Sequence, residues 1–154
     1  MNGRVPENEQ VGSDEGSVRR IDVELFIIHP TIAPAEITAA LELEPQLAQC
    51  VGEPRRTPKG TLLDGLYPDT RWRHSIRYEL RDQLFSDKVT LLVDRLMLHK
   101  NFLGHLRDSG GQASIIVQFL GDGYVGDDVP LNTLAKMVDL QLDFGIECYS
   151  VPQS

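Results

Sequence analysis

Hydrophobic and polar residues alternate with a period of two in several parts of the chain. The pattern is clear at 21–27 and at 70–80, and it returns at 115–119 and at 142–148. A period of two is typical of a strand that has one face on a core. We therefore predict four main strands, together with a weak short strand at 46–51.

Apolar residues at steps of three and four predict helices between these strands. Pro34 opens a short helix at a position where its missing N–H costs nothing, and Pro45 stops that helix. Ser86 is a good N-cap for a second helix. A final helix covers about 130–140, whereas the Gly-, Pro- and Arg-rich segment 52–69 has no period and predicts a long loop.

The order of these elements predicts one α+β domain. Strand, helix, strand, strand, helix, strand is the split βαβ pattern of a ferredoxin-like open antiparallel sheet, here with an added C-terminal helix-strand unit. In that arrangement the first and third strands lie side by side and antiparallel at the sheet centre, and one sheet face can stay open. Residues 1–17 have no hydrophobic period and predict a disordered leader, so the domain is expected to cover 18–154.

Composition and charge narrow the class of protein. The chain has 154 residues, of which 41% are hydrophobic, and a formal net charge of −8, which argues against a general nucleic-acid binder. No segment resembles a signal peptide or a membrane span. The chain has only two cysteines, Cys50 and Cys148, and is predicted to be cytoplasmic with both thiols reduced. We expect neither nucleic acid nor membrane as a partner.

The sequence carries no recognisable catalytic, cofactor or metal-binding motif. No nucleophile elbow, zinc pattern or phosphate loop is present, and the four histidines do not converge along the chain. The segment 121–128 is rich in Gly and Asp, but it lacks the alternating ligands and the closing glutamate of an EF-hand. We therefore expect no catalytic residue, cofactor or metal.

The segment from Gly52 to Arg81 has the opposite charge to the rest of the chain, with seven basic and four acidic residues. Guanidinium groups recognise carboxylate and phosphate, so this segment is the predicted contact for a partner or an anionic ligand. The candidate contact residues are Arg55, Arg56, Lys59, Arg71, Arg73 and Arg77. The alternative is that Asp22 and Glu24 of the first strand pair with the arginines of the third strand, and that the loop is simply solvated.

Several short motifs together resemble an uncharacterised bacterial domain-of-unknown-function family numbered 4279. The likeness runs from about Ile21 to Tyr149. It rests on His29-Pro30, Pro34 to Thr38, Leu41 to Pro45, Gly52, Gly60, Thr70-Arg71-Trp72 and the closing unit from Leu131 to Tyr149. The resemblance implies no catalytic residues, and the lysine expected just before Gly52 is replaced here by Val51.

Three functions are compatible with these features. The first is a non-enzymatic protein-binding module, accessory or immunity-like, of a bacterial cytosol, whose negative charge favours a basic partner such as a nuclease toxin. The alternative is a small anionic-ligand sensor or carrier that uses the basic 52–81 region. The third is an enzyme with an unrecognised site around His74. A homodimer is also a candidate state, through an exposed edge strand or through Phe26 and Ile116.

Overall fold

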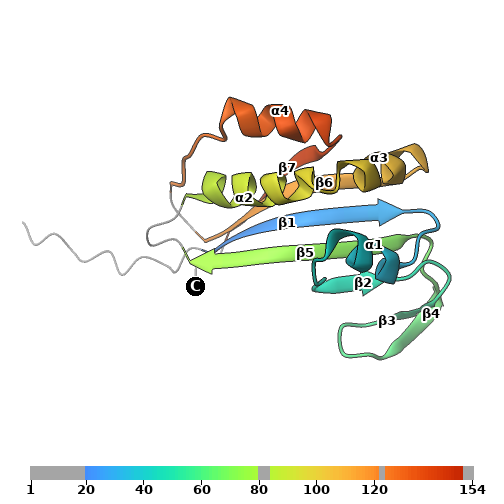
Figure 1. Cartoon of the computed structure of the whole chain (residues 1–154). Coiled ribbons are helices and arrows are strands. Elements are labelled where there is room, and N and C mark those ends of the chain that lie inside the picture. Colours follow the sequence, from blue (N-terminus) through green and yellow to red (C-terminus); the bar gives the residue numbers. More distant parts are fainter. Residues whose placement is uncertain (1–19, 80–83, 122–123, 151–154) are drawn as a thin grey trace, which may run out of the picture.

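The computed structural model describes residues 20–79, 84–121 and 124–150. Within these ranges the protein has four helices, a mixed five-stranded sheet and a separate two-stranded hairpin, which makes it an α+β protein (Figure 1). In chain order the elements are β1 (Arg20–His29), α1 (Pro34–Leu41), β2 (Leu47–Gln49), β3 (Pro54–Arg56), β4 (Leu62–Leu66), β5 (Thr70–Glu79), α2 (Phe85–Met97), α3 (Lys100–Asp108), β6 (Gln112–Leu120), α4 (Leu131–Asp139) and β7 (Asp143–Tyr149).

The five-stranded sheet has the order β2-β5-β1-β6-β7, with β1 at its centre. β1 pairs antiparallel with β5, from Arg20 opposite Glu79 to His29 opposite Thr70, and antiparallel with β6 on its other side. The predicted antiparallel contact between the first strand and the strand that begins at Thr70 is confirmed. β7 is parallel to β6, so the sheet is mixed and not antiparallel throughout.

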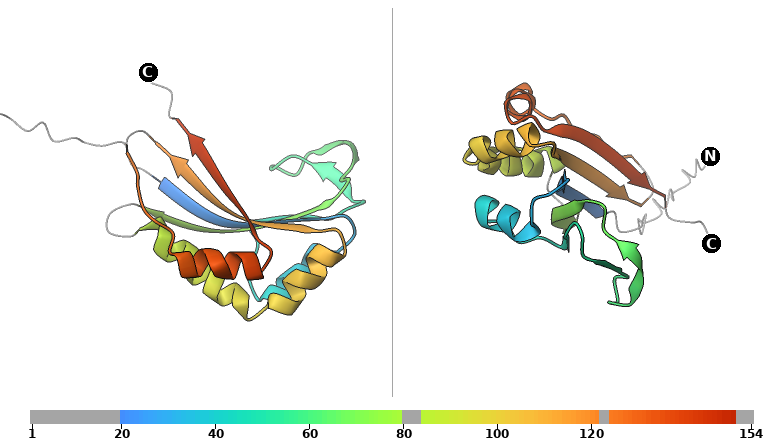
Figure 2. Two further views of the ribbon diagram at one scale, coloured as in Figure 1. Left: turned by 90° about the horizontal axis from the view of Figure 1, so that it is seen from above. Right: turned by 90° about the vertical axis from the view of Figure 1, so that its right-hand side faces the viewer.

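The helices lie on one face of the sheet, and the other face is open (Figure 2). Alternate residues of β1, from Ile21 to Ile27, are buried on the helical face. They form one apolar cluster with Trp72 of β5 and Ile115 of β6. Burial of each such side chain contributes about 1.5–3 kcal/mol, so the period of two in the sequence marks the face that stabilises the fold.

His29 ends β1 and fixes the turn into α1 through its buried ring. Its Nδ1 accepts hydrogen bonds from the backbone N–H groups of Thr31 and Ile32, at 3.0 and 2.9 Å. Nδ1 is therefore unprotonated, so Nε2 carries the proton and donates it to Ser109 Oγ at 2.9 Å. Burial lowers the pKa of His29, and the charge of His105 acts in the same direction. The His-Pro pair in the sequence is thus a structural turn.

The prediction that Ser86 is the N-cap of α2 was wrong. Leu84 occupies the N-cap position and makes no side-chain cap bond. Ser86 lies inside the first turn, and its backbone N–H donates to Asp127 Oδ2 at 2.9 Å. A carboxylate from the segment before α4 thus satisfies one of the unpaired N–H groups at the start of this helix.

The segment predicted as a long loop at 52–69 contains a β-hairpin. β3 and β4 pair antiparallel, with Pro54 opposite Leu66 and Arg56 opposite Leu62. In the left view of Figure 2 the hairpin rises from one end of the sheet, on the face without helices. Every residue of β3 and β4 is exposed, so no buried face imposes the alternation by which a strand is recognised in a sequence.

The remaining predictions concern the two thiols, membrane-spanning segments and the N-terminal leader. Cys50 and Cys148 are both free, as predicted. None of the helices in the described ranges is long and apolar enough to cross a lipid bilayer. The leader predicted at 1–17 and the side chain of Arg81 fall outside the residues that the structure describes.

Candidate functional site

The structure separates the six predicted contact residues into two groups. Arg55 and Arg56 lie in β3, and Lys59 lies in the turn between β3 and β4. Arg71, Arg73 and Arg77 alternate along β5 on the open face of the sheet. By contact the groups are different. Arg73 and Arg77 contact the acids of β1, whereas Arg71 lies beside Arg55 and Arg56 of the hairpin.

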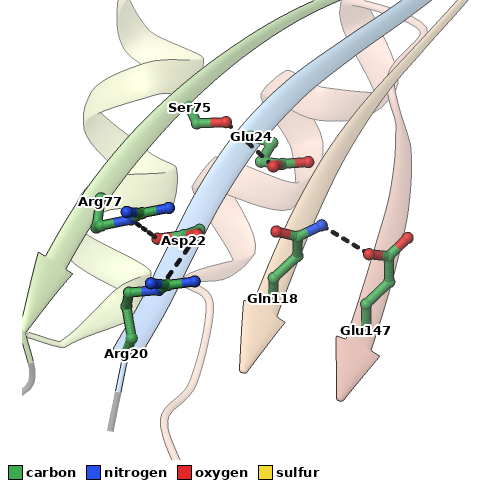
Figure 3. A network of polar contacts seen from close by, with 7 residues as sticks. All are labelled: Arg20, Asp22, Glu24, Ser75, Arg77, Gln118 and Glu147. Atoms are coloured by element: carbon green, nitrogen blue, oxygen red, sulfur yellow. Dashed lines mark hydrogen bonds and ion pairs between the residues drawn. The ribbon is translucent and has the colours of Figure 1, made fainter. Parts of the chain in front are cut away.

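The acids of β1 pair with the arginines of β5. This confirms the alternative in which Asp22 and Glu24 form ion pairs with these arginines within the sheet. Arg77 Nε donates to Asp22 Oδ1 at 3.2 Å, and Arg20 Nε lies 3.8 Å from Asp22 Oδ2 (Figure 3). Arg73 Nε lies 3.3 Å from Glu24 Oε2, and the guanidinium of Arg73 stacks over the ring of Phe26 at 5.0 Å. The charges of Arg73 and Arg77 are therefore already balanced within the sheet.

Glu24 is a buried carboxyl at the centre of the open face, with 3% of its surface exposed. The hydroxyl of Ser75 donates to its Oε1 at 3.1 Å. Its Oε2 faces Arg73 as an ion pair, but the orientation gives neither atom a hydrogen-bond partner among the described residues. Burial raises the pKa of Glu24, although the charge of Arg73 and the hydrogen bond from Ser75 act in the opposite direction.

The same network continues onto β6 and β7 (Figure 3). Gln118 Nε2 donates to Glu147 Oε2 at 2.7 Å, and the hydroxyl of Tyr149 donates to the same oxygen at 2.9 Å. This hydrogen bond raises the pKa of Tyr149. Sequence reasoning missed both residues of β7, although their alternation with Ile146 and Cys148 would have placed them on the open face once β7 was set beside β6.

Replacing Glu24 by Gln is expected to weaken the dependence of stability on pH. Because the folded-state pKa of Glu24 is raised, its contribution to stability is fully present below its ordinary pKa of 4.5 and is lost as the pH rises through the folded-state value. Glutamine is neutral at every pH. The free energy of unfolding of Glu24→Gln, minus that of the wild type, should therefore increase as the pH rises above 4.5.

Urea unfolding over a series of pH values measures this difference. Glu44→Gln is the matched control, because it removes the same charge from an exposed position. Parallel curves of stability against pH for Glu24→Gln and the wild type would contradict the role assigned to the buried carboxyl.

The β3–β4 hairpin is held at its base by Tyr67. Its hydroxyl oxygen accepts from the backbone N–H of Arg56 at 3.0 Å, and its hydroxyl lies 3.3 Å from the Arg56 carbonyl oxygen. Backbone hydrogen bonds from Gly52 to Tyr67 and from Tyr67 to Glu53, both 2.9 Å, close the hairpin below this point. An isolated hairpin is marginally stable in water, and these bonds stabilise this one.

Three leucines of the hairpin point into solvent. Leu62 and Leu66 are 60% and 59% exposed, and Leu63 is also exposed. An arginine lies next to one of these apolar groups, since Arg56 is paired with Leu62 across the two strands. The hairpin thus presents apolar and cationic side chains together. Its two strands lie on the same side of the sheet as the open face (Figure 2).

A hollow of about 490 Å³ lies beside the hairpin and brings together Arg55, Arg56 and Arg71, with Gln49 and Tyr67 also in its wall. Each guanidinium is oriented by a local bond. Arg55 donates to the Asp64 carbonyl oxygen at 3.4 Å, Arg56 to the Gly60 carbonyl oxygen at 3.1 Å, and Arg71 to Asp69 Oδ1 at 3.0 Å. Each bond uses one nitrogen of a group that has five N–H donors, so donors remain for another ligand. Lys59 does not line this hollow.

Other candidate chemistry is weaker. His74, the residue around which an unrecognised enzyme site was considered, is half-buried, and its Nδ1 lies 2.6 Å from the carbonyl oxygen of Glu44. Across 20–79, 84–121 and 124–150, no three His, Cys, Asp or Glu side chains come together as a set that could hold a metal ion. The hairpin with its hollow is therefore the feature that best qualifies as a site.

By fold and surface, this is an α+β protein with an open sheet face and a protruding hairpin that is both apolar and basic. No protein-family model, no curated protein and no solved structure matches the chain. Its function must be inferred from its own residues.

Proposed function

We propose that the protein is a non-enzymatic protein-binding module, of the accessory or immunity-like kind, that contacts its partner through the β3–β4 hairpin. The supporting observation is the exposure of Leu62 and Leu66, 60% and 59%, on a hairpin that also carries arginines. Exposed apolar groups gathered in one place mark interaction surfaces, and Arg and Tyr are enriched where binding energy is concentrated.

The charge of the hairpin favours an acidic partner. Net charge alone suggested a basic target, but the hollow is lined by three arginines, Arg55, Arg56 and Arg71, against one carboxyl group, Asp69. Complementary charge across an interface speeds association and rejects wrong partners. The matching surface is therefore an acidic segment with apolar residues that cover the leucines.

Selection from a displayed library of random peptides tests this proposal. We expect the wild-type protein to enrich peptides that combine Asp or Glu with large apolar residues. A double variant, Leu62→Asp with Leu66→Asp, should lose at least about tenfold in affinity, or 1.4 kcal/mol, because it removes the apolar contact and adds repulsion. The affinity of a selected peptide is measured by fluorescence anisotropy.

Leu98→Asp is the matched control, since Leu98 is an exposed leucine at the C-terminal end of α2. It should bind the selected peptide as the wild type does. Equal loss in both variants, or enrichment of basic peptides, would contradict the proposed hairpin contact.

A second candidate function is the capture of a small anionic ligand in the hollow. Its support is the convergence of Arg55, Arg56 and Arg71 around about 490 Å³. Phosphate, citrate and ATP are suitable probes, and one that binds should stabilise the protein by about 2.7 kcal/mol at a hundredfold excess over its dissociation constant. The shift in thermal unfolding should vanish in Arg71→Gln. An unchanged unfolding temperature with all three probes would count against this function.

We also infer a ferredoxin-like arrangement for the part of the fold before α4. The antiparallel order β2-β5-β1-β6 supports it, with α1 after β1 and with α2 and α3 between β5 and β6. We further propose that the chain belongs to the uncharacterised bacterial family numbered 4279 and that it lies in a bacterial cytoplasm. The structural roles of His29 and Trp72, which both carry the resemblance, support the first of these.

A further inference from the structure

β7 is an edge strand with an unusual composition for an exposed edge. It is the last strand in the sheet order and is paired with β6 alone. Natural edge strands are commonly protected by Lys, Pro or inward-pointing charges, because their free N–H and C=O groups can pair with another chain. The segment Asp143–Tyr149 contains neither Lys nor Pro, and of its two acids Glu147 is already bonded to Gln118 and Tyr149.

Two apolar residues of β7 lie on the helical face of the sheet, next to the buried residues of β6, but are themselves exposed. Phe144 and Ile146 are aligned with Ile115 and Val117 of β6, which are fully buried on the helical face. Ile146 is nevertheless 62% exposed, and Phe144 is exposed as well. The helical face of the sheet therefore ends in uncovered apolar side chains.

The outer flank of α4 extends this apolar strip. α4 directs Thr133 and Lys136 towards α2, where Thr133 Oγ1 lies 2.9 Å from Thr90 Oγ1 and Lys136 Nζ lies 2.7 Å from Asp94 Oδ1. At about 100° per residue, the opposite flank of the helix carries Leu131, Leu134 and Val138. All three are exposed, Val138 by 75%. This flank is opposite the one that contacts α2, and α4 lies at the side of the helical layer where β7 forms the edge of the sheet (Figure 2).

We propose that this edge binds a second copy of the chain. β7 pairs antiparallel with the partner's β7 around a twofold axis at Ile146, which gives a continuous ten-stranded sheet with the outer flanks of the two α4 helices above the joint. A twofold interface uses the same surface on both copies, so the exposed apolar groups of this strip meet those of the partner's strip.

The charges of β7 favour this register. Pairing over the whole strand, from Asp143 to Tyr149, places the axis at its middle residue, Ile146. Ile146 then lies opposite the partner's Ile146, Glu147 opposite the partner's Gly145, and Asp143 opposite the partner's Tyr149. A shift of the axis by one residue to Gly145 places Asp143 opposite the partner's Glu147, and a shift to Glu147 places two glutamates together. Like charges directly opposite each other are destabilising, so the full-length register is the favoured one.

This surface is independent of the proposed hairpin contact. The hairpin joins β2 to β5, which are at the other side of the sheet from β7. A dimer through β7 therefore leaves both hairpins uncovered.

Sedimentation equilibrium tests the dimer. The wild-type chain should show a mass that approaches twice 17.2 kDa as its concentration rises. Ile146→Lys places two like charges on the twofold axis and should stay a monomer, with an unchanged circular dichroism spectrum. Leu98→Lys, which changes an exposed leucine elsewhere, should behave as the wild type does.

Disulfide trapping tests the register. In a background with Cys50→Ser and Cys148→Ser, oxidation of Ile146→Cys should give a covalent dimer, because opposite residues in an antiparallel pair have Cα atoms about 4.5–5.5 Å apart, within the range of a disulfide. Glu147→Cys should not, because the two introduced thiols would lie two positions apart along the strands, with Cα atoms roughly 8 Å apart.

The proposal is overturned by a wild-type chain that stays monomeric at every concentration, or by an Ile146→Lys variant that still dimerises. A stronger disulfide from Glu147→Cys than from Ile146→Cys would also reject it.

Discussion

Trp72→Ala is expected to lower the free energy of unfolding by about 3–5 kcal/mol. The side chain of Trp72 is fully buried, and its indole Nε1–H donates to Thr38 Oγ1 of α1 at 3.0 Å. Removal of the indole leaves a cavity between β5 and α1 and an unpaired hydroxyl. Natural domains have about 5–15 kcal/mol of stability, so this one change removes a large share of it.

Urea unfolding followed by circular dichroism measures this effect, since the variant lacks the only tryptophan of the chain. Thr38→Val is the companion variant, because it keeps the packing and removes only the acceptor of the indole N–H. Its expected cost is about 1–3 kcal/mol, and it should be the smaller of the two. A midpoint for Trp72→Ala within error of the wild type would show that Trp72 does not hold α1 to the sheet.

Gly111→Ala is expected to be the second most damaging change, with a cost of about 1–3 kcal/mol or more. A Cβ at Gly111 would lie 2.7 Å from His29 Cδ2 and 2.7 Å from the carbonyl oxygen of Leu106, and it would also overlap the side chain of Leu106. The backbone oxygen cannot rotate away as a flexible side chain could. The added methyl group must displace either the β1–α1 turn or the end of α3.

Gly104→Ala provides a control of opposite sign. Gly104 lies within α3, and a Cβ there would meet no atom within 4 Å. Alanine in a helix interior is favoured over glycine by about 0.5–1 kcal/mol, so this variant should be more stable than the wild type. If thermal unfolding showed Gly111→Ala to be as stable as Gly104→Ala, the close packing at His29 would be wrong.

The strands that could be predicted are those with one buried face. The alternation at 21–27 located β1 to within two residues at each end, and the pairing of Asp22 and Glu24 with arginines followed from the placement of β5 beside β1. In both cases burial imposes a pattern that is local in the sequence. The architecture was predictable wherever the apolar period is strong.

The hairpin and the start of α2 could not be predicted, for two physical reasons. β3 and β4 bury no residue, so their sequence is not constrained by a core. The N–H of Ser86 binds Asp127, 41 residues away, and no local motif reports a contact at that distance. The sequence therefore predicted the candidate site only as a basic segment. The arrangement of its residues depends on a hairpin that no pattern in the sequence predicts.

The central position of β1 has a consequence for how the chain is completed during synthesis. β1 is the first described element to be translated, yet its antiparallel neighbours come much later, since Asp22 contacts Arg77 at a separation of 55 residues. Contacts of long sequence separation slow folding, because the loop between them must close before any contact forms. Until β6 emerges from the ribosome, one edge of β1 has no native partner strand. A nascent chain that lacks β6 therefore exposes the backbone N–H and C=O groups of that edge, which can pair with another chain.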